Sequence, residues 1–220
     1  MHKPYLTMKV CAMRQSRHTL QRDLYAVAAG QGGYFTAAQA AAAGYRYPQQ
    51  VYQRRLGAWE PIDRGLFRLR DFPPGEHEDL IRWSLWSRDR RGDILATVSH
   101  ETAADLYGLG DVMPARVHLT VPPGFRKPAP EGCILHVARL APGDIAARGG
   151  FRVTTPTRTV RDLAASPLAE DHFAKVLRDA LRSGLVRRKH LLTADIPDAA
   201  SRRTVRALAA IQEGETVSHA

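Results

Sequence analysis

Residues 36–69 read TAAQAAAAGYRYPQQVYQRRLGAWEPIDRGLFRL, and this stretch decides the fold of the first third of the chain. Thr36 and Gln39 have the spacing of a capping box, in which the two residues cap backbone N–H groups at the start of a helix. Pro48 is favourable in the first turn of a second helix because its missing N–H is not needed there. Two short apolar runs around Asp63-Arg64-Gly65 have the pattern of a β-hairpin. The stretch therefore predicts helices over 36–43 and 48–56 and strands over 59–62 and 66–69.

An apolar stripe with helical spacing precedes this stretch and is formed by Leu20, Leu24, Val27 and Ala28. Gly30 ends the pattern and with it the predicted helix. Three short helices followed by a hairpin are the plan of a winged helix-turn-helix, in which few residues join the second and third helices. We therefore expect a winged helix-turn-helix domain over 19–71, preceded by a flexible basic arm over 1–18.

The positive charge of the chain is concentrated near its N-terminus. Lys plus Arg total 32 and Asp plus Glu total 22, which gives a formal net charge of +10. Residues 1–70 hold 11 basic and three acidic side chains, so they carry +8 of that excess. No carboxylate occurs between Asp23 and Glu60, a gap of 36 residues. A basic segment followed by a nearly neutral one is typical of a nucleic-acid-binding domain joined to a module with another role.

The helix predicted over 48–56 carries planar, multi-donor side chains of the kind that bind base edges in DNA. Residues four apart on a helix lie on one face, so we expect one exposed, base-reading strip of Gln49, Gln50, Gln53 and Arg54. Tyr52 and Leu56 are expected on the other side, packed with Trp59. The alternative is an ordinary solvated polar face without a ligand.

Several arginines near this helix and in the predicted hairpin are candidates for contacts with DNA phosphates. We assign this role to Arg46, Arg55, Arg64 and Arg68, with Arg64 at the tip of the hairpin, or wing. The expected partner is double-stranded DNA.

Beyond Pro73-Pro74-Gly75 the sequence mixes short apolar runs with short helical patterns and lacks βαβ regularity. We expect a mixed α/β domain over 75–195, so that the whole chain is of the α+β class, and a C-terminal helix and tail over 196–220. The helices are predicted over 76–90, 99–107, 158–165, 171–183 and 203–211, and the strands over 94–98, 117–121, 134–137 and 151–154.

Catalytic and metal-binding patterns are weak in this second domain. Ser99 and His100 are adjacent in sequence, and Ser99 is better placed as a helix cap than as a nucleophile. The histidines are scattered and lack helical metal-ligand spacing: His77, His118, His136 and His172. Asp171 and Lys175 resemble a nuclease pair only superficially. We therefore predict no enzymatic activity, no catalytic residues, no bound metal and no cofactor.

Composition excludes other classes of protein. The chain is 44% hydrophobic and 25% charged, as in ordinary globular proteins, and no apolar run approaches 18 residues. We expect no membrane contact. The two cysteines, Cys11 and Cys133, are expected to be unpaired thiols in a cytoplasmic protein.

Four blocks of this sequence together resemble the AbiEi-type antitoxins, the antitoxin halves of bacterial abortive-infection toxin–antitoxin operons. The resemblance extends from about Leu20 to Leu191, and it is the order and spacing of the blocks that are specific. The blocks are GYFTAAQA at 33–40, RLGAWEPIDRGLFRL at 55–69, VSHETA at 98–103 and TPTRTVRDL at 155–163.

The resemblance implies a winged-helix transcriptional autoregulator that binds an inverted-repeat operator and represses its own promoter. It implies a C-terminal domain that counteracts a nucleotidyltransferase-like toxin, with direct contact left open. A basic face of that domain contributes to DNA binding in the family, and the nearest candidate here is Arg187-Arg188-Lys189. Some related chains append a nuclease domain, for which we expect too little sequence after Asp195.

Two other functions stay open at this point. One is a DNA-targeted, nuclease-like enzyme that uses Asp171. The other is a transcriptional regulator that senses a small ligand beside Trp83, Trp86 and Tyr107, although these side chains are more typical of core packing.

Overall fold

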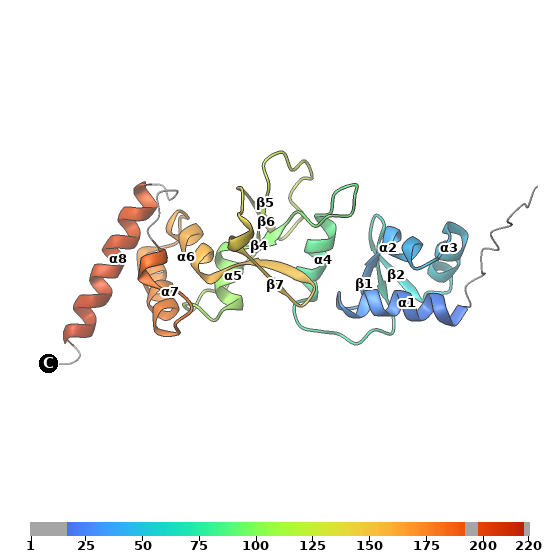
Figure 1. Ribbon diagram of the computed structural model, residues 1–220, viewed down its shortest axis with the longest axis horizontal. Helices are drawn as coiled ribbons and strands as arrows, with labels where there is room; N and C mark the ends of the chain where they lie inside the picture. The colour runs from blue at the N-terminus through green and yellow to red at the C-terminus, as the bar shows by residue number, and fades with distance from the viewer. Residues whose placement is uncertain (1–16, 192–197, 218–220) are drawn as a thin grey trace, which may run out of the picture. The chain divides into compact units, whose positions relative to one another are not determined.

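The computed structural model describes residues 17–191 and 198–217, and the chain divides into two compact units, Met1–Pro73 and Pro74–Ala220. Each unit combines helices with one sheet, so the predicted mixture of helices and strands is confirmed (Figure 1). The predicted basic arm over 1–18 lies, except for its last two residues, outside the described residues. No helix within 17–191 and 198–217 has both the length and the apolar character that crossing a membrane requires.

From residue 17 on, the N-terminal unit has three helices and a small antiparallel sheet with the strand order β1-β3-β2. Its elements are α1 (Arg17–Ala29), β1 (Tyr34–Thr36), α2 (Ala37–Ala42), α3 (Tyr47–Arg55), β2 (Trp59–Asp63) and β3 (Leu66–Leu69). The helices and strands predicted over 36–69 are therefore confirmed, with bounds that shift by at most one residue.

The predicted capping box forms at the start of α2. The Gln39 N–H donates to Thr36 Oγ1 over 3.1 Å, and the Thr36 N–H donates to Gln39 Oε1 over 2.8 Å. Below this cap, Phe35 packs edge-on against Trp59, with ring centroids 4.8 Å apart, and Trp59 also meets Tyr45 and Phe67. These rings fill the core of the unit together with Leu20 and Leu24 from α1, Ala28 and Ala40.

The C-terminal unit contains a five-stranded mixed sheet with the order β6-β5-β4-β8-β7. Pairing is parallel between β5 and β6 and between β4 and β8, and antiparallel elsewhere. Its strands are β4 (Thr97–Val98), β5 (Val117–Val121), β6 (Cys133–Val137), β7 (Ile145–Arg148) and β8 (Phe151–Thr154). Its α-helices are α4 (Glu78–Trp86), α5 (His100–Leu106), α6 (Pro156–Ala164), α7 (Glu170–Arg182) and α8 (Asp198–Val217). Two 3₁₀ turns, η1 (Pro142–Asp144) and η2 (Arg188–His190), complete the unit.

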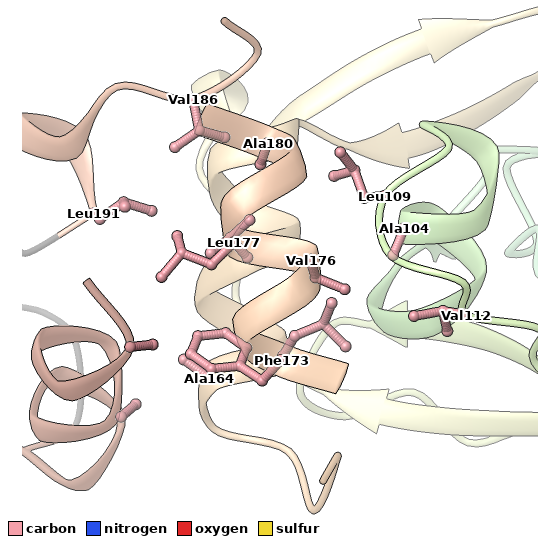
Figure 2. Close-up of a cluster of buried hydrophobic side chains, with 14 of the residues drawn as sticks. Ala104, Leu109, Val112, Ala164, Phe173, Val176, Leu177, Ala180, Val186 and Leu191 are labelled. Carbon is pink, nitrogen blue, oxygen red and sulfur yellow. The ribbon is translucent and has the colours of Figure 1, made fainter. Parts of the chain in front are cut away.

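A helical core lies beside this sheet, and α7 runs through it. Figure 2 shows Phe173, Val176 and Leu177 of α7 between residues of the α5 region and Leu191. Helix α8 packs on the same cluster through Ala200, Ala207 and Ile211. The C-terminal helix, predicted over 203–211, thus runs over Asp198–Val217 and is part of this core.

Two strands differ from the prediction. The expected strand over 94–98 is reduced to Thr97–Val98, because the N–H groups of Leu95 and Ala96 donate to Ser87 Oγ, over 3.1 and 2.8 Å, instead of joining a ladder. The edge strand β7 was not predicted, and its sequence, Ile-Ala-Ala-Arg, lacks the alternating pattern that identifies a strand.

Candidate functional site

The site predicted from sequence centres on α3, which begins directly after a short turn from α2. Gly44 takes a positive φ of 97° in this turn, and Arg46 donates its N–H to Gln49 Oε1 over 2.8 Å at the start of the helix. Pro48 lies in the first turn, as predicted. The side chain of Gln49 is therefore exposed but used, through its oxygen, in capping the helix.

Gln50 faces the interior of the unit. Its side chain is buried, with 8% of the residue surface exposed. Its Nε2 donates to the carbonyl oxygen of Tyr45 over 3.0 Å and lies 3.3 Å from that of Ala37. The expectation that Gln50 is exposed is therefore wrong: its amide donates to the Tyr45 carbonyl in the turn between α2 and α3.

The rotation of α3 also changes the role of its apolar residues. Tyr52 and Leu56 are 49% and 59% exposed, so the prediction that they pack with Trp59 is wrong. Trp59 instead packs against Phe35 and Tyr45. The core of the unit is filled by rings from other elements, and α3 turns Gln50 towards it.

Of the other predicted base-reading residues, Gln53 is half-buried and Arg54 is exposed. The Arg54 guanidinium lies 5.6 Å from the centroid of the Phe67 ring, so its stem runs towards the sheet. One side of α3, about 100° around the helix axis from Gln50, carries Tyr47, Val51 and Arg55 at spacings of four residues. Tyr47 is 76% exposed and Arg55 is also exposed.

The hairpin of β2 and β3 places Arg64 at its exposed tip. The Arg64 N–H donates to Asp63 Oδ1 over 2.6 Å, and Gly65 supplies the positive φ of 67° that the turn requires. Arg68 is half-buried, and its guanidinium donates to the Phe72 carbonyl over 3.0 Å. Of the four arginines assigned to phosphates, Arg46, Arg55 and Arg64 are therefore exposed, while Arg68 is directed to the backbone of its own unit.

In the C-terminal unit, the three basic residues of the second predicted patch, Arg187-Arg188-Lys189, are all exposed at the turn η2. The Asp171 carboxylate is 81% exposed, and Lys175 pairs with Asp111 instead. These contacts give no support to a nuclease-like pair of Asp171 and Lys175.

The aromatic residues considered for a ligand pocket make ordinary packing contacts. The Tyr107 hydroxyl donates to the Thr154 carbonyl over 3.0 Å. Trp86 meets the rings of Trp83 and Phe125 edge-on.

The expectation that the histidines are scattered is wrong. His118 of β5 and His136 of β6 lie together with His100, the first residue of α5, and one ring nitrogen from each lies within 4.8 Å of the others. Ser99 takes the cap position of α5, but its hydroxyl lies 2.9 Å from His100 Nδ1 and accepts a hydrogen bond from Thr120. The Ser99 side chain is fully buried, which suits a support for His100 and not a nucleophile.

Sequence reasoning missed this cluster because its members are 18 residues apart along the chain. The available signal was spacing within each strand: His118 and Thr120 are two residues apart on β5, as are Ile134 and His136 on β6, so each pair lies on one face of its strand. In the parallel register Thr120 lies beside His136 and His118 beside Ile134, so the two histidines share one face of the sheet.

Comparisons with known proteins agree with the resemblance drawn from the sequence. The family model of the AbiEi antitoxin C-terminal domain matches residues 96–213. Among solved structures, the chain is similar to the RV2827C protein from Mycobacterium tuberculosis, with a TM-score of 0.58 and 18% identity, over 89% of this chain and 78% of that one. No curated protein matches. Because the family model covers more than half of the chain, this protein belongs to the AbiEi antitoxin family.

Proposed function

We propose that this protein is a DNA-binding antitoxin that represses the promoter of its own toxin–antitoxin operon. The observation that carries the proposal is the exposed side of α3, which lies in a stretch of 36 residues without a carboxylate and next to an arginine-tipped hairpin. Membership of an antitoxin family supports the biological setting. The protein would act in the cytoplasm, where its operator lies, and without catalysing a reaction.

The order of elements in the N-terminal unit supports a winged helix-turn-helix. Helices α2 and α3 are separated by four residues, and the antiparallel hairpin of β2 and β3 follows α3 directly. In such domains the helix that follows the tight turn enters the major groove, and the hairpin contacts the backbone or the minor groove. On this plan α3 is the recognition helix and Arg64 lies on the wing.

The rotation of α3 in the structure revises which side chains meet the bases. Gln50 is excluded by its burial, and Gln53 and Arg54 lie at the sides of the helix. We place Arg55 on the base-reading face together with Tyr47 and Val51, with Arg54 at its margin. Gln49 lies on another side of the helix, with Gln53. Arginine recognises guanine through two parallel hydrogen bonds, and apolar side chains contact the thymine methyl group.

Contacts with phosphates are assigned to Arg46 and Arg64, which are both exposed. Arg187-Arg188-Lys189 is a second candidate patch for phosphates in the C-terminal unit. A nucleotidyltransferase-like toxin is the partner that this C-terminal unit would counteract.

Fluorescence anisotropy with the full chain tests the DNA-binding proposal. The probes are a duplex with the inverted repeat upstream of its own gene and a scrambled duplex of the same length. We expect Arg55→Met to relax the preference between the two duplexes by about 1–3 kcal/mol. Arg64→Met should weaken binding to both duplexes and reduce the slope of log affinity against log salt by about 0.9.

Arg22→Met is the matched control, because Arg22 is an exposed arginine of α1 outside the proposed surface. It should leave both affinities unchanged. Equal affinity of the wild-type chain for the two duplexes, or equal losses from all three substitutions, would contradict the proposed interface.

A further inference from the structure

We propose that His100, His118 and His136 form a binding site for one divalent transition-metal ion that prefers imidazole ligands, Zn²⁺ being the foremost candidate. None of these three residues is among those proposed to contact DNA. Neither the sequence pattern nor the family assignment indicates it.

The geometry of two of the imidazoles already fits a metal. His136 Nε2 lies 3.2 Å from His118 Nδ1 in a hydrogen bond, whose proton must move to the other nitrogen of its ring before both atoms can bind a metal. Two nitrogens bound tetrahedrally to one Zn²⁺ at about 2.0–2.1 Å are about 3.4 Å apart, so this pair has the spacing of two ligands of one ion. The parallel register of β5 and β6 fixes that spacing, because both side chains arise from the same face of adjacent strands.

The third imidazole is held close by its backbone. His100 has a φ of 51°, a left-handed conformation that is uncommon for a residue other than glycine. Its ring stacks on that of His136, with centroids 3.5 Å apart and planes inclined by 13°. Nitrogen lone pairs of parallel rings do not converge on a single point, so metal binding requires the His100 ring to turn out of this stack. The ligand nitrogens already lie within 4.8 Å of one another, so a rotation of one side chain is sufficient.

The Ser99 hydroxyl is a hydrogen-bond partner for the second nitrogen of His100. His100 Nδ1 lies 2.9 Å from the buried Ser99 hydroxyl, which also accepts a hydrogen bond from Thr120 over 2.8 Å. With the Nδ1 proton donated to Ser99, the lone pair of Nε2 is available to a metal. Histidine ligands in metalloproteins commonly use their second nitrogen in such a hydrogen bond, which fixes the tautomer.

The charges around the cluster are compatible with a neutral imidazole set. Burial and the neighbouring histidines lower the pKa of His100 to about 3 and that of His136 to about 4, and burial lowers the pKa of His118 as well. All three rings are therefore neutral at pH 7, which is the form that binds metals.

Three charged side chains also act on the cluster. The negative charge of Glu101 acts on His136 and favours the binding of a cation. The positive charge of Arg116 acts on His118 and opposes it. Arg158 acts on His100, but its charge is balanced by Asp144 and Asp162, 2.9 and 2.8 Å away.

The three histidines leave one position of a tetrahedral ion for water or for another ligand, since they supply three of the four ligands. His100 and His136 are half-buried, whereas His118 is 8% exposed. The imidazole set selects ions such as Zn²⁺, Co²⁺, Ni²⁺ and Cu²⁺ over Mg²⁺ and Ca²⁺, which prefer oxygen ligands.

Metal titration of the full, untagged chain tests this proposal. After treatment with a chelator, Zn²⁺ is titrated in competition with a chromophoric chelator, and Co²⁺ is used as a spectroscopic probe. We expect one tightly bound Zn²⁺ per chain and visible Co²⁺ absorption of four-coordinate type. His136→Gln and His100→Gln should each weaken Zn²⁺ binding by at least about 10–100-fold, and Ser99→Ala by about tenfold.

His172→Gln is the matched control, because the His172 side chain is 56% exposed on α7. It should leave binding unchanged. Circular dichroism establishes that each variant is folded. If a histidine variant unfolds, Ser99→Ala still tests the site, because it keeps all three ligands. Absence of Zn²⁺ binding by the wild-type chain, or binding that His172→Gln reduces as much as His136→Gln does, would overturn the proposal.

Discussion

The two units of this protein bury different kinds of side chain. The N-terminal unit fills its core with aromatic rings and alanines, and of its arginines Arg46, Arg55 and Arg64 are exposed. The C-terminal unit buries most of an arginine together with two carboxylates. The arginines proposed for DNA binding in the first unit are therefore exposed, whereas Arg158 in the second is part of what stabilises the fold. Substitutions of the same chemical kind should have opposite consequences in the two units.

The largest effect on folding is expected from Arg158→Met. Arg158 donates to Asp162 and Asp144, and the three side chains are only 17%, 11% and 20% exposed. Burial raises the pKa of Asp162, and the neighbouring Arg158 acts in the opposite direction. The charged form of this carboxylate therefore depends on Arg158. Removal of Arg158 should lower the free energy of unfolding of the C-terminal unit by about 2–4 kcal/mol.

Hydrogen exchange of α6 in urea measures this loss in the C-terminal unit alone. Arg126→Met is the control, since Arg126 is exposed in the same unit, and it should change stability by less than about 0.5 kcal/mol. If both substitutions had the same small effect, the ion pairs would not be structural.

The second effect is a loss of stability of the C-terminal unit in mild acid. The pKa values of His100 and His136 are lowered to about 3 and about 4, so the folded chain binds fewer protons than the unfolded chain below pH 6.5. The free energy of unfolding should therefore fall as the pH decreases, by about 1–3 kcal/mol between pH 6.5 and 5. Tyr45, which is buried in the N-terminal unit, has a raised pKa and does not titrate in this range.

Urea unfolding in the presence of a chelator, followed separately in the two units by hydrogen exchange, measures this dependence. The double variant His100→Gln/His136→Gln should lose most of the slope between pH 6.5 and 5. A slope that persists in the double variant would assign the dependence to other groups.

A smaller effect is expected from Gln50→Ala, the exception in the N-terminal unit. Gln50 is a buried polar side chain whose amide donates to the Tyr45 carbonyl. Its removal should lower the stability of this unit by about 1–2 kcal/mol, because a buried carbonyl loses its partner. Gln53→Ala, at a half-buried position of the same helix, should cost less than about 0.5 kcal/mol. Equal losses would show that the burial of Gln50 does not matter.

That these segments form helices could be predicted, because the residues that cap each helix are close together in sequence. The capping box of Thr36 and Gln39 and the proline of α3 are complete within four residues of sequence. The rotation of α3 could not be predicted in this way, because the helix has no apolar stripe to face the core. Its buried residue is a glutamine whose partner, the Tyr45 carbonyl, is a backbone group that the sequence pattern does not identify.

The histidine cluster escaped prediction for a different reason. His100, His118 and His136 become neighbours only through the pairing and register of β5 and β6 and the position of α5. Spacing along the chain identifies metal ligands when they lie on one helix or loop, but not when they come from separate strands. The ion pair of Arg158 and Asp162 is of the kind that spacing does identify, since these residues are four apart on α6.

The smallest effect on folding is expected from Arg55→Met, and it completes the comparison with Arg158→Met. Arg55 is exposed near the end of α3, so the loss of its charge should change the free energy of unfolding by less than about 0.5 kcal/mol. Urea unfolding and operator binding are measured on the same preparation. A variant that stays stable and loses its preference for the operator assigns Arg55 to binding. If Arg55→Met instead destabilised its unit as much as Arg158→Met destabilises the other, arginines would have one structural role throughout the chain. The contrast between the two units would then be wrong, because it requires the exposed arginine to be dispensable for folding.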